Sequence, residues 1–310
     1  MIPRTVANRF ADRMGVDLHI AQQEIVLLYA LDALASQGIL EKLVFKGGTY
    51  LRIMVTGDVG RLSEDLDFTN QGLPEDPERE LTAAFAPEHY GVRFRIVEPY
   101  RTARRNWACQ VRYSHEWDEG QFRLEISFRE MPFLPPRKWA PLPQPYFAAL
   151  PFVPPEIPSL WVEEALAEKL RAIQQRATER DLYDAMRYGR RGFNPDLVRL
   201  LAVAKLWNDR EAFDPDRVLG TLSQGRREWP DLERLIGRVR RRNWNEDAAE
   251  AARRFRFLRD LTPFERGLVA DARRHSMRKE LQDRLAIYAL PSGGKPPAGG
   301  PTSSVAGRLN

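Results

Sequence analysis

Residues 45–68 read FKGGTYLRIMVTGDVGRLSEDLDF, with two glycines and a threonine ahead of a short helical run and a D-x-D at the end. Asp65 and Asp67 alternate with Leu66 and Phe68, which is the period of a half-buried strand. Two carboxylates at this spacing point to the same side of a strand, roughly 6–7 Å apart. They repel each other unless a cation lies between them. The pair is therefore expected to be either solvated at a surface or bound to a metal ion.

The residues upstream of this pair fit an anion site. Gly47 and Gly48 open a short helix, where backbone N–H groups can approach an anion and the helix N-terminus adds partial positive charge. Thr49 and Ser63 are expected to hydrogen-bond the same anion, and Lys46 precedes the glycines. The surrounding pattern is neither a G-x-x-x-x-G-K-[ST] loop nor a G-x-G-x-x-G turn after a strand. An ordinary capped helix can also begin with G-G-T, so the motif gains its meaning from the carboxylates that follow it.

A phosphate site beside paired carboxylates is suited to a nucleoside triphosphate held by Mg²⁺, with Mn²⁺ as the alternative metal. The metal bridges phosphate oxygens and carboxylates, and it neutralises charge on the departing pyrophosphate. A third carboxylate from a neighbouring strand would complete such a site. Glu125 is the candidate, because it lies on the polar side of the alternating segment QFRLEISF, residues 121–128. For Glu125 the alternative of a solvent-facing strand residue stays open.

The bulk composition is that of an ordinary globular protein with two domains. The chain has 310 residues, of which 43% are hydrophobic and 29% charged, and a net charge of +5. Its one cysteine excludes an intramolecular disulfide, which fits a cytoplasmic location. We expect neither a signal peptide nor a contact with the membrane, since no apolar stretch is long enough to span a bilayer.

The residue pattern changes along the chain and predicts its domains. A helix is expected over residues 17–37, and the alternating segments that follow indicate an α+β or α/β unit. About ten prolines between residues 131 and 158 indicate an extended connector. The following region has helical periodicity and arginine clusters, which either neutralise phosphates or form solvated helix faces. We predict a catalytic domain over residues 1–155, a helical domain over 156–290 and a disordered Gly/Pro/Ser-rich tail over 291–310.

Two sequence elements together resemble the AbiEii/AbiGii family of nucleotidyltransferase toxins, the MenT-type toxins of bacterial toxin–antitoxin systems. The first is K-G-G-T followed by R-x-S-x-D-x-D, within residues 46–67. The second is E-K-L-R-A at 168–172 followed by R-D-L-Y-D at 180–184. The resemblance covers residues 15–190. It implies an α+β fold, with a nucleotidyltransferase-like mixed sheet flanked by helices and followed by a mainly helical C-terminal domain.

The second element raises a geometric question about Lys169 and Asp184. On one unbroken helix, fifteen residues at about 1.5 Å each would separate them by about 22 Å. The absence of Gly and Pro over residues 176–180 favours one continuous helix. The resemblance instead implies two helices that bring both residues to the nucleotide, and this is the expectation we adopt. Lys169 would then meet the triphosphate as a point charge.

Several neighbouring residues have two interpretations. Asp181 or Asp184 would orient Lys169, an arginine or the acceptor, but Asp181 could equally cap the second helix. Arg176 and Arg180 could contact phosphate, or they could pair with Glu179 and Asp184 on a surface helix. Lys46, beside the glycines, is a further candidate for contact with the nucleotide.

The leading hypothesis is a Mg²⁺-dependent nucleotidyltransferase in which Asp65, Asp67 and Glu125 hold the metal and a hydroxyl attacks the α-phosphorus. The resemblance implies that the acceptor is the 3′ end of tRNA, whose modification would block translation and growth. It also implies a cognate antitoxin protein. The basic helical half is then the expected RNA surface. Two alternatives remain, namely modification of a protein hydroxyl by the same fold, and a nucleotide- or RNA-binding module without turnover.

Overall fold

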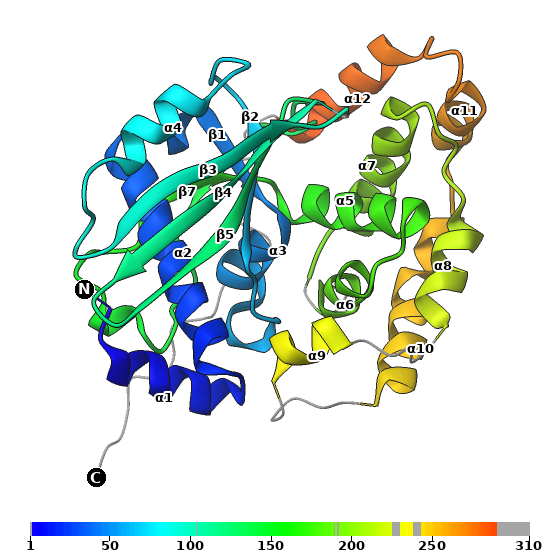
Figure 1. Ribbon diagram of the computed structural model, residues 1–310. Helices are drawn as coiled ribbons and strands as arrows, with labels where there is room; N and C mark the ends of the chain where they lie inside the picture. The colour runs from blue at the N-terminus through cyan, green and yellow to red at the C-terminus, as the bar shows by residue number, and fades with distance from the viewer. Residues whose placement is uncertain are drawn as a thin grey trace, which may run out of the picture.

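The computed structural model describes residues 2–103, 105–188, 190, 192–224, 230–237 and 243–289. The strands in this part of the chain are β1 (Leu43–Lys46), β2 (Asp65–Asn70), β3 (Arg93–Arg101), β4 (Asn106–His115), β5 (Asp118–Ser127), β6 (Arg137–Trp139) and β7 (Ile157–Ser159). They form one sheet in the order β3-β4-β5-β2-β1-β7-β6 (Figure 1). β2 pairs with β5, and β1 with β7, in parallel, whereas the other neighbours are antiparallel. The predicted mixed sheet is confirmed.

The helices lie around this sheet and C-terminal to it. Those within the first half of the chain are α1 (Arg4–Met14), α2 (Leu18–Ser36), α3 (Gly47–Tyr50) and α4 (Glu78–Phe85). The later helices are α5 (Val162–Gln175), α6 (Glu179–Tyr188), α7 (Pro195–Asn208), α8 (Pro215–Ser223), α9 (Pro230–Ile236), α10 (Trp244–Arg254), α11 (Pro263–Asp271) and α12 (Arg278–Ala289). Figure 1 shows α5 to α8 and α10 to α12 gathered beside the sheet, which confirms the mainly helical C-terminal region. None of the helices described is long and apolar enough to cross a membrane.

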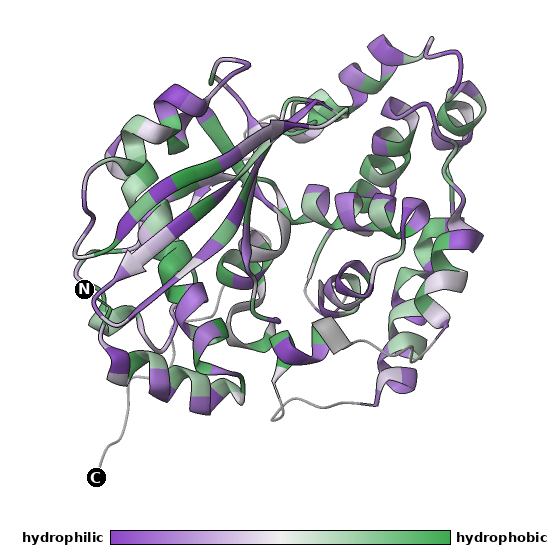
Figure 2. Cartoon of the chain, viewed as in Figure 1, coloured by the Kyte–Doolittle hydropathy of each residue, from purple (hydrophilic) through white to green (hydrophobic). Residues whose placement is uncertain are grey.

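The core explains why the sheet has one polar face. α2, which is mostly green in the hydropathy colouring of Figure 2, is buried from Ile20 to Leu31, as expected for a helix that is apolar on nearly all sides. In Figure 1, α2 and α4 lie on one side of strands β3 to β5. In β2 the alternation is equally clear, because Leu66 and Phe68 are buried while Asp65 and Asp67 are only partly so. The strand pattern therefore places the two carboxylates on the face opposite the buried apolar residues.

The boundaries agree with the sequence-based expectations for the long elements. The helix expected over residues 17–37 is α2, and the strand expected at the D-x-D is β2. The short helix that the two glycines open is α3, which continues as a π-helical turn over Leu51–Thr56. β7 extends the sheet beyond the predicted boundary at residue 155, and the division into domains stays a prediction. The predicted tail over residues 291–310 lies outside the described residues.

A buried ionic cluster joins α5 and α7 to the segment that follows β5. Glu130 accepts a hydrogen bond from Arg171 at 2.6 Å and lies 3.5 Å from the ammonium of Lys205. Lys205 is almost fully buried and also pairs with Glu164 at 2.9 Å and Glu168 at 3.2 Å. Burial alone would raise the pKa of Glu130, but Lys205 and Arg171 outweigh it and lower the pKa to about 2. Glu130 therefore adds to the stability of this cluster only while its carboxylate is ionised.

Glu130→Gln is expected to reduce the dependence of stability on pH in acid. Because the folded pKa lies below the ordinary value, the carboxylate contributes to the free energy of unfolding above about pH 4.5 and loses that contribution as the pH falls toward 2. A pKa shift of this size corresponds to a contribution of about 3 kcal/mol to the free energy of unfolding. Urea unfolding at several acidic pH values would measure the free energy of unfolding of wild type and variant. The difference between the two should become smaller as the pH falls. A difference in the free energy of unfolding that does not change with pH contradicts this account. Glu41→Gln, at an exposed pair with Lys138, is the matched control.

Candidate active site

The paired aspartates lie at the centre of the sheet, on β2 between β1 and β5. The strand register places Lys46 opposite Asp67 on one side and Glu125 opposite Asp67 on the other. Directly opposed residues of neighbouring strands share a face, so these three side chains form one row across the sheet. Asp65 has Arg123 as its neighbour on β5. The register of β2 and β5 therefore brings together Asp67 and Glu125, which are more than fifty residues apart in the sequence.

The electrostatics of this row favour a bound cation. Burial, followed by the negative charges of Asp65 and Glu125, raises the pKa of Asp67 to about 6. Lys46 and Lys169 oppose this shift without cancelling it. The pKa of Asp65 is also raised, chiefly by burial, while the cation of Arg180 acts in the opposite direction. Two carboxylates that repel each other when ionised are stabilised in that form by a divalent cation between them.

Asp65 and Asp67 fit the donor set of Mg²⁺, whereas Glu125 has other partners. Mg²⁺ is commonly held by one or two carboxylates together with water and substrate phosphates. Glu125 accepts hydrogen bonds from Arg123 and from the amide of Asn106. Within the described ranges, no three His, Cys, Asp or Glu side chains lie close enough together to hold a metal ion alone. The role of Glu125 as a third metal ligand stays a prediction.

The two glycines allow close packing around the aspartates. Gly47 has a left-handed φ of 79°, and a Cβ atom there would overlap the carboxylate of Asp67. A Cβ atom on Gly48 would overlap the guanidinium of Arg61 and lie 3.1 Å from Oγ of Ser63. The glycines thus leave space for the carboxylate and the guanidinium beside the backbone. The sequence predicted only that the backbone at these glycines contacts an anion. Their role in packing is visible only in the structure.

Gly47→Ala is expected to reduce activity strongly with a smaller effect on the fold. The new methyl group must displace the Asp67 carboxylate, and alanine is strained at a left-handed φ, so a loss of about 100-fold in rate is expected from a misplacement of about 1 Å. Initial rates of nucleotide transfer with matched melting curves would measure it. Gly38→Ala is the control, since its φ is 69° and a Cβ atom there meets nothing within 4 Å. Equal rates for the two variants would contradict this role of Gly47.

Thr49 and Ser63 lie beside the aspartates, but Thr49 has an internal partner. The Thr49 hydroxyl donates to the backbone carbonyl of Asp65 and is buried. This hydroxyl thus ties α3 to the start of β2, and its contact with the triphosphate stays a prediction. Ser63 is buried near Gly48, and its contact with the triphosphate also stays a prediction.

The second sequence element forms two helices, as the resemblance implied. α5 ends at Gln175, Ala177 has a left-handed φ of 53°, and α6 begins at Glu179. Thr178 accepts a hydrogen bond from the backbone N–H of Asp181 at 3.4 Å and donates to its carboxylate at 2.7 Å. Thr178, rather than Asp181, therefore caps α6. The continuous helix favoured by the absence of Gly and Pro is wrong, because this cap stabilises the turn.

The turn brings Lys169 between two carboxylates of α6. Its ammonium lies 2.9 Å from Asp184 and 3.1 Å from Asp181. Burial lowers the pKa of Lys169, but the charges of Asp184 and Asp181 outweigh it and raise the pKa above its usual value. Lys169 is therefore held as a fixed cation. Asp181 also accepts a hydrogen bond from Arg176 at 2.9 Å, and the side chain of Arg176 remains 62% exposed.

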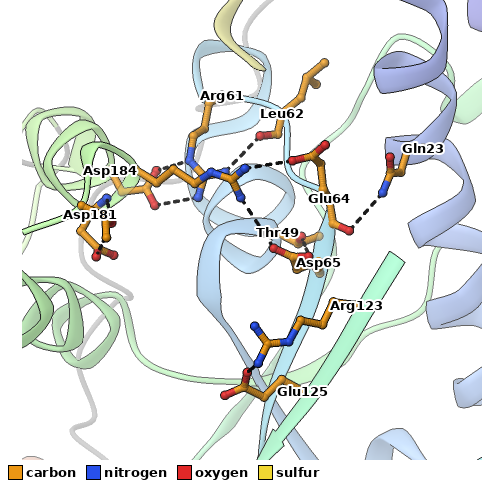
Figure 3. A network of polar contacts seen from close by, with 12 residues as sticks. Gln23, Thr49, Arg61, Leu62, Glu64, Asp65, Arg123, Glu125, Asp181 and Asp184 are labelled. Carbon is orange, nitrogen blue, oxygen red and sulfur yellow. Dashed lines mark hydrogen bonds and ion pairs between the residues drawn. The ribbon is translucent and has the colours of Figure 1, made fainter. Parts of the chain in front are cut away.

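Arg61, the arginine of the R-x-S-x-D-x-D pattern, links the two sequence elements. Its guanidinium donates to both oxygens of Asp184, from Nε at 2.9 Å and from Nη2 at 3.1 Å (Figure 3). Both side chains are buried, and the contact joins the segment before β2 to α6. The arginine of the R-x-S-x-D-x-D pattern was the signal in the sequence. Its partner could not be identified there, because the two residues are 123 positions apart.

Two further residues complete the surroundings. Arg180 donates to Glu64 at 3.0 Å and lies 3.7 Å from Asp65, so the alternative in which it pairs with Glu179 or Asp184 is wrong. The ammonium of Lys46 lies 4.0 Å from Glu168 of α5, the first residue of the E-K-L-R-A element. Cations from α5, α6 and β1 thus surround the carboxylates of β2.

The comparisons with known proteins agree with this arrangement. The sequence model described as "Nucleotidyl transferase AbiEii toxin, Type IV TA system" matches residues 29–270. Among solved structures, the chain is similar to MenT4, a nucleotidyltransferase toxin from Mycobacterium tuberculosis H37Rv. The identity is 29% and the TM-score 0.76, over 93% of this chain and 99% of that chain. A likeness to JHP933 from Helicobacter pylori has 21% identity and a TM-score of 0.48, over 82% of this chain and 98% of that one.

The comparison with curated proteins gives no match. The likeness to JHP933 is too distant to support an argument, whereas the family match spans well over half of the 310 residues. It includes both sequence elements and every candidate site residue described above. The chain therefore belongs to the AbiEii family of nucleotidyltransferase toxins of type IV toxin–antitoxin systems.

Proposed function

We propose that this toxin transfers a nucleoside monophosphate from a nucleoside triphosphate to the 3′ end of tRNA, with Mg²⁺ held by Asp65 and Asp67. The observation that carries the proposal is the row of carboxylates on the polar face of the sheet, in which burial and neighbouring negative charge raise the pKa of Asp67 to about 6. A protein that only bound RNA or nucleotide would gain nothing from that repulsion. We therefore propose catalysis rather than binding alone.

The residues around the row have complementary tasks in this proposal. A bound Mg²⁺ would supply charge neutralisation at the triphosphate and at the leaving pyrophosphate. Lys169, held by Asp181 and Asp184, presents a second, fixed positive charge that needs no reorganisation during the reaction. Arg176, whose side chain is mostly exposed, can contact a phosphate at the rim of the site. Lys46 lies beside Asp67 and can reach the same phosphates.

Addition of a nucleotide to the 3′ end of tRNA would occupy the hydroxyl that aminoacylation requires, so translation and growth would stop. The description of the family as the toxin of a type IV toxin–antitoxin system supports a cognate antitoxin as partner. The arginines of the C-terminal helices support an RNA acceptor, since RNA-binding surfaces neutralise phosphates with such side chains.

A transfer assay tests this proposal. The purified protein and its Asp65→Ala/Asp67→Ala variant would be incubated with Mg²⁺, total tRNA and each α-labelled nucleoside triphosphate in turn. Label on tRNA that requires both aspartates supports the proposal and identifies the preferred nucleotide. Label on a protein band instead would favour modification of a protein hydroxyl. Saturable RNA binding without transfer in Mg²⁺ or Mn²⁺ would favour a binding module.

A further inference from the structure

Strand β3 contains an extra residue opposite β4, close to the candidate active site. Val97 is opposite Gln110 and Tyr100 is opposite Ala108, so the register shifts between these two pairs. The backbone of Glu98 in this bulge is left-handed, with a φ of 52°, which is uncommon for residues other than glycine. Because side chains alternate along a strand, the extra residue moves Tyr100 onto the face that carries Val97 and Gln110. In a regular strand Tyr100 would lie on the opposite face.

The bulge aligns Tyr100 with the carboxylates. Tyr100, Ala108, Glu125 and Asp67 occupy one register row across four adjacent strands, β3, β4, β5 and β2. At a strand spacing of about 4.8 Å, the row places Tyr100 about 10 Å from Glu125 and about 14 Å from Asp67. Ala108 is small and buried, so only its methyl group stands between Tyr100 and Glu125 on this face. Tyr100 thus lies on the same face of the sheet as the carboxylates, within three strand spacings of Asp67.

Tyr100 is also connected to the carboxylates by Arg123. Tyr100 is 43% exposed, and the guanidinium carbon of Arg123 lies 5.9 Å from the centroid of its ring. The same guanidinium contacts Glu125, and Figure 3 shows these two side chains close to Asp65. An arginine over an aromatic ring is an attractive cation–π arrangement that holds the ring in one orientation. An exposed aromatic ring beside a basic side chain is the equipment that proteins use to stack nucleobases.

We infer that Tyr100 is a stacking platform for a nucleobase whose phosphate is directed at Asp65 and Asp67. The inference rests on the proposed function, which brings two nucleobases to this site, that of the incoming nucleotide and the terminal base of the acceptor. Stacking uses the face of the base, so the platform accepts any base and adds affinity rather than sequence readout. Arg123 orients the ring and offers its charge to the adjoining phosphate.

Steady-state kinetics with variants of Tyr100 tests the inference. Tyr100→Ala is expected to raise KM for one substrate by about 5- to 100-fold, the range for the loss of one base stack. A raised KM for the nucleoside triphosphate identifies the incoming base, and a raised KM for RNA identifies the acceptor base. Tyr100→Phe keeps the ring and should behave as wild type, whereas Tyr100→Leu keeps only the bulk and should behave as Tyr100→Ala. Tyr90→Ala, at a tyrosine that is 46% exposed away from the site, is the control.

A binding measurement separates this inference from the transfer reaction itself. 2-Aminopurine, as the free riboside triphosphate or at the 3′ end of an RNA, loses fluorescence when it stacks on an aromatic ring. Quenching by wild type and Tyr100→Phe, but not by Tyr100→Ala, supports the platform even if no transfer to RNA is found and the proposed function fails. Unchanged KM values and unchanged quenching in Tyr100→Ala would overturn the platform, whatever the fate of the proposed function. An equal loss in Tyr100→Phe would also overturn it, because the hydroxyl and not the ring would then matter.

Discussion

Asp67→Asn is expected to reduce nucleotide transfer by at least about 1,000-fold while leaving the fold intact. A carboxylate that binds a catalytic metal supports several kcal/mol of transition-state stabilisation, and each 1.4 kcal/mol or so corresponds to a factor of ten in rate. The substitution keeps the shape of the side chain, so it creates no cavity. It also removes a negative charge that Asp65 and Glu125 repel. In a metal-free buffer, the melting temperature of the variant should therefore equal or exceed that of wild type.

Transfer rates and melting curves in EDTA measure the two halves of this prediction. Asp12→Asn, at an exposed carboxylate on α1, is the control and should change neither quantity. Full activity of Asp67→Asn would mean that the metal site is wrongly placed. A large fall in its melting temperature would mean that Asp67 is a structural residue.

Asp184→Asn is expected to destabilise the protein by about 3–5 kcal/mol, the usual cost of removing one partner from a buried ion pair. The Asp184 carboxylate accepts two hydrogen bonds from Arg61 and lies 2.9 Å from the ammonium of Lys169. In the variant, Asp181 still pairs with Lys169. Within the described residues, no other carboxylate lies within ion-pair distance of Arg61. For a chain of this size the melting temperature should fall by roughly 10 °C.

Chemical unfolding of Asp184→Asn and of a surface counterpart measures this effect. Asp216→Asn removes the carboxylate of an exposed pair with Arg259 and should change the free energy of unfolding by less than about 1 kcal/mol. Similar losses in the two variants would show that the Arg61–Asp184 contact does not join the sheet to α6 as described.

The strands and the long helices could be predicted because they depend on local periodicity. The alternation around Asp65 and Asp67 identified both the strand and its polar face, and the same pattern placed Glu125 on the polar side of β5. The register between β2 and β5 could not be predicted, because it is decided by packing between segments far apart in the sequence. The row that joins Asp67 to Glu125 and Tyr100 is therefore visible only in the structure.

The turn between α5 and α6 shows a signal that was present in the sequence and missed. Thr178 and Asp181 have the spacing of a capping box, which marks the start of a helix even where Gly and Pro are absent. Counting helix breakers alone led to the continuous helix. The partners of Arg61 and Lys46, by contrast, had no local signal, since Asp184 and Glu168 come from distant helices.

The most direct test of the central claim compares two forms of one tRNA as acceptors. Intact tRNA and the same tRNA with its terminal ribose oxidised by periodate would be incubated with the protein, Mg²⁺ and the preferred α-labelled nucleoside triphosphate. The account predicts label on intact tRNA, release of pyrophosphate, and no label on the oxidised form, which lacks the 3′ hydroxyl. Equal label on both forms, or label on protein alone, would contradict transfer to the 3′ end.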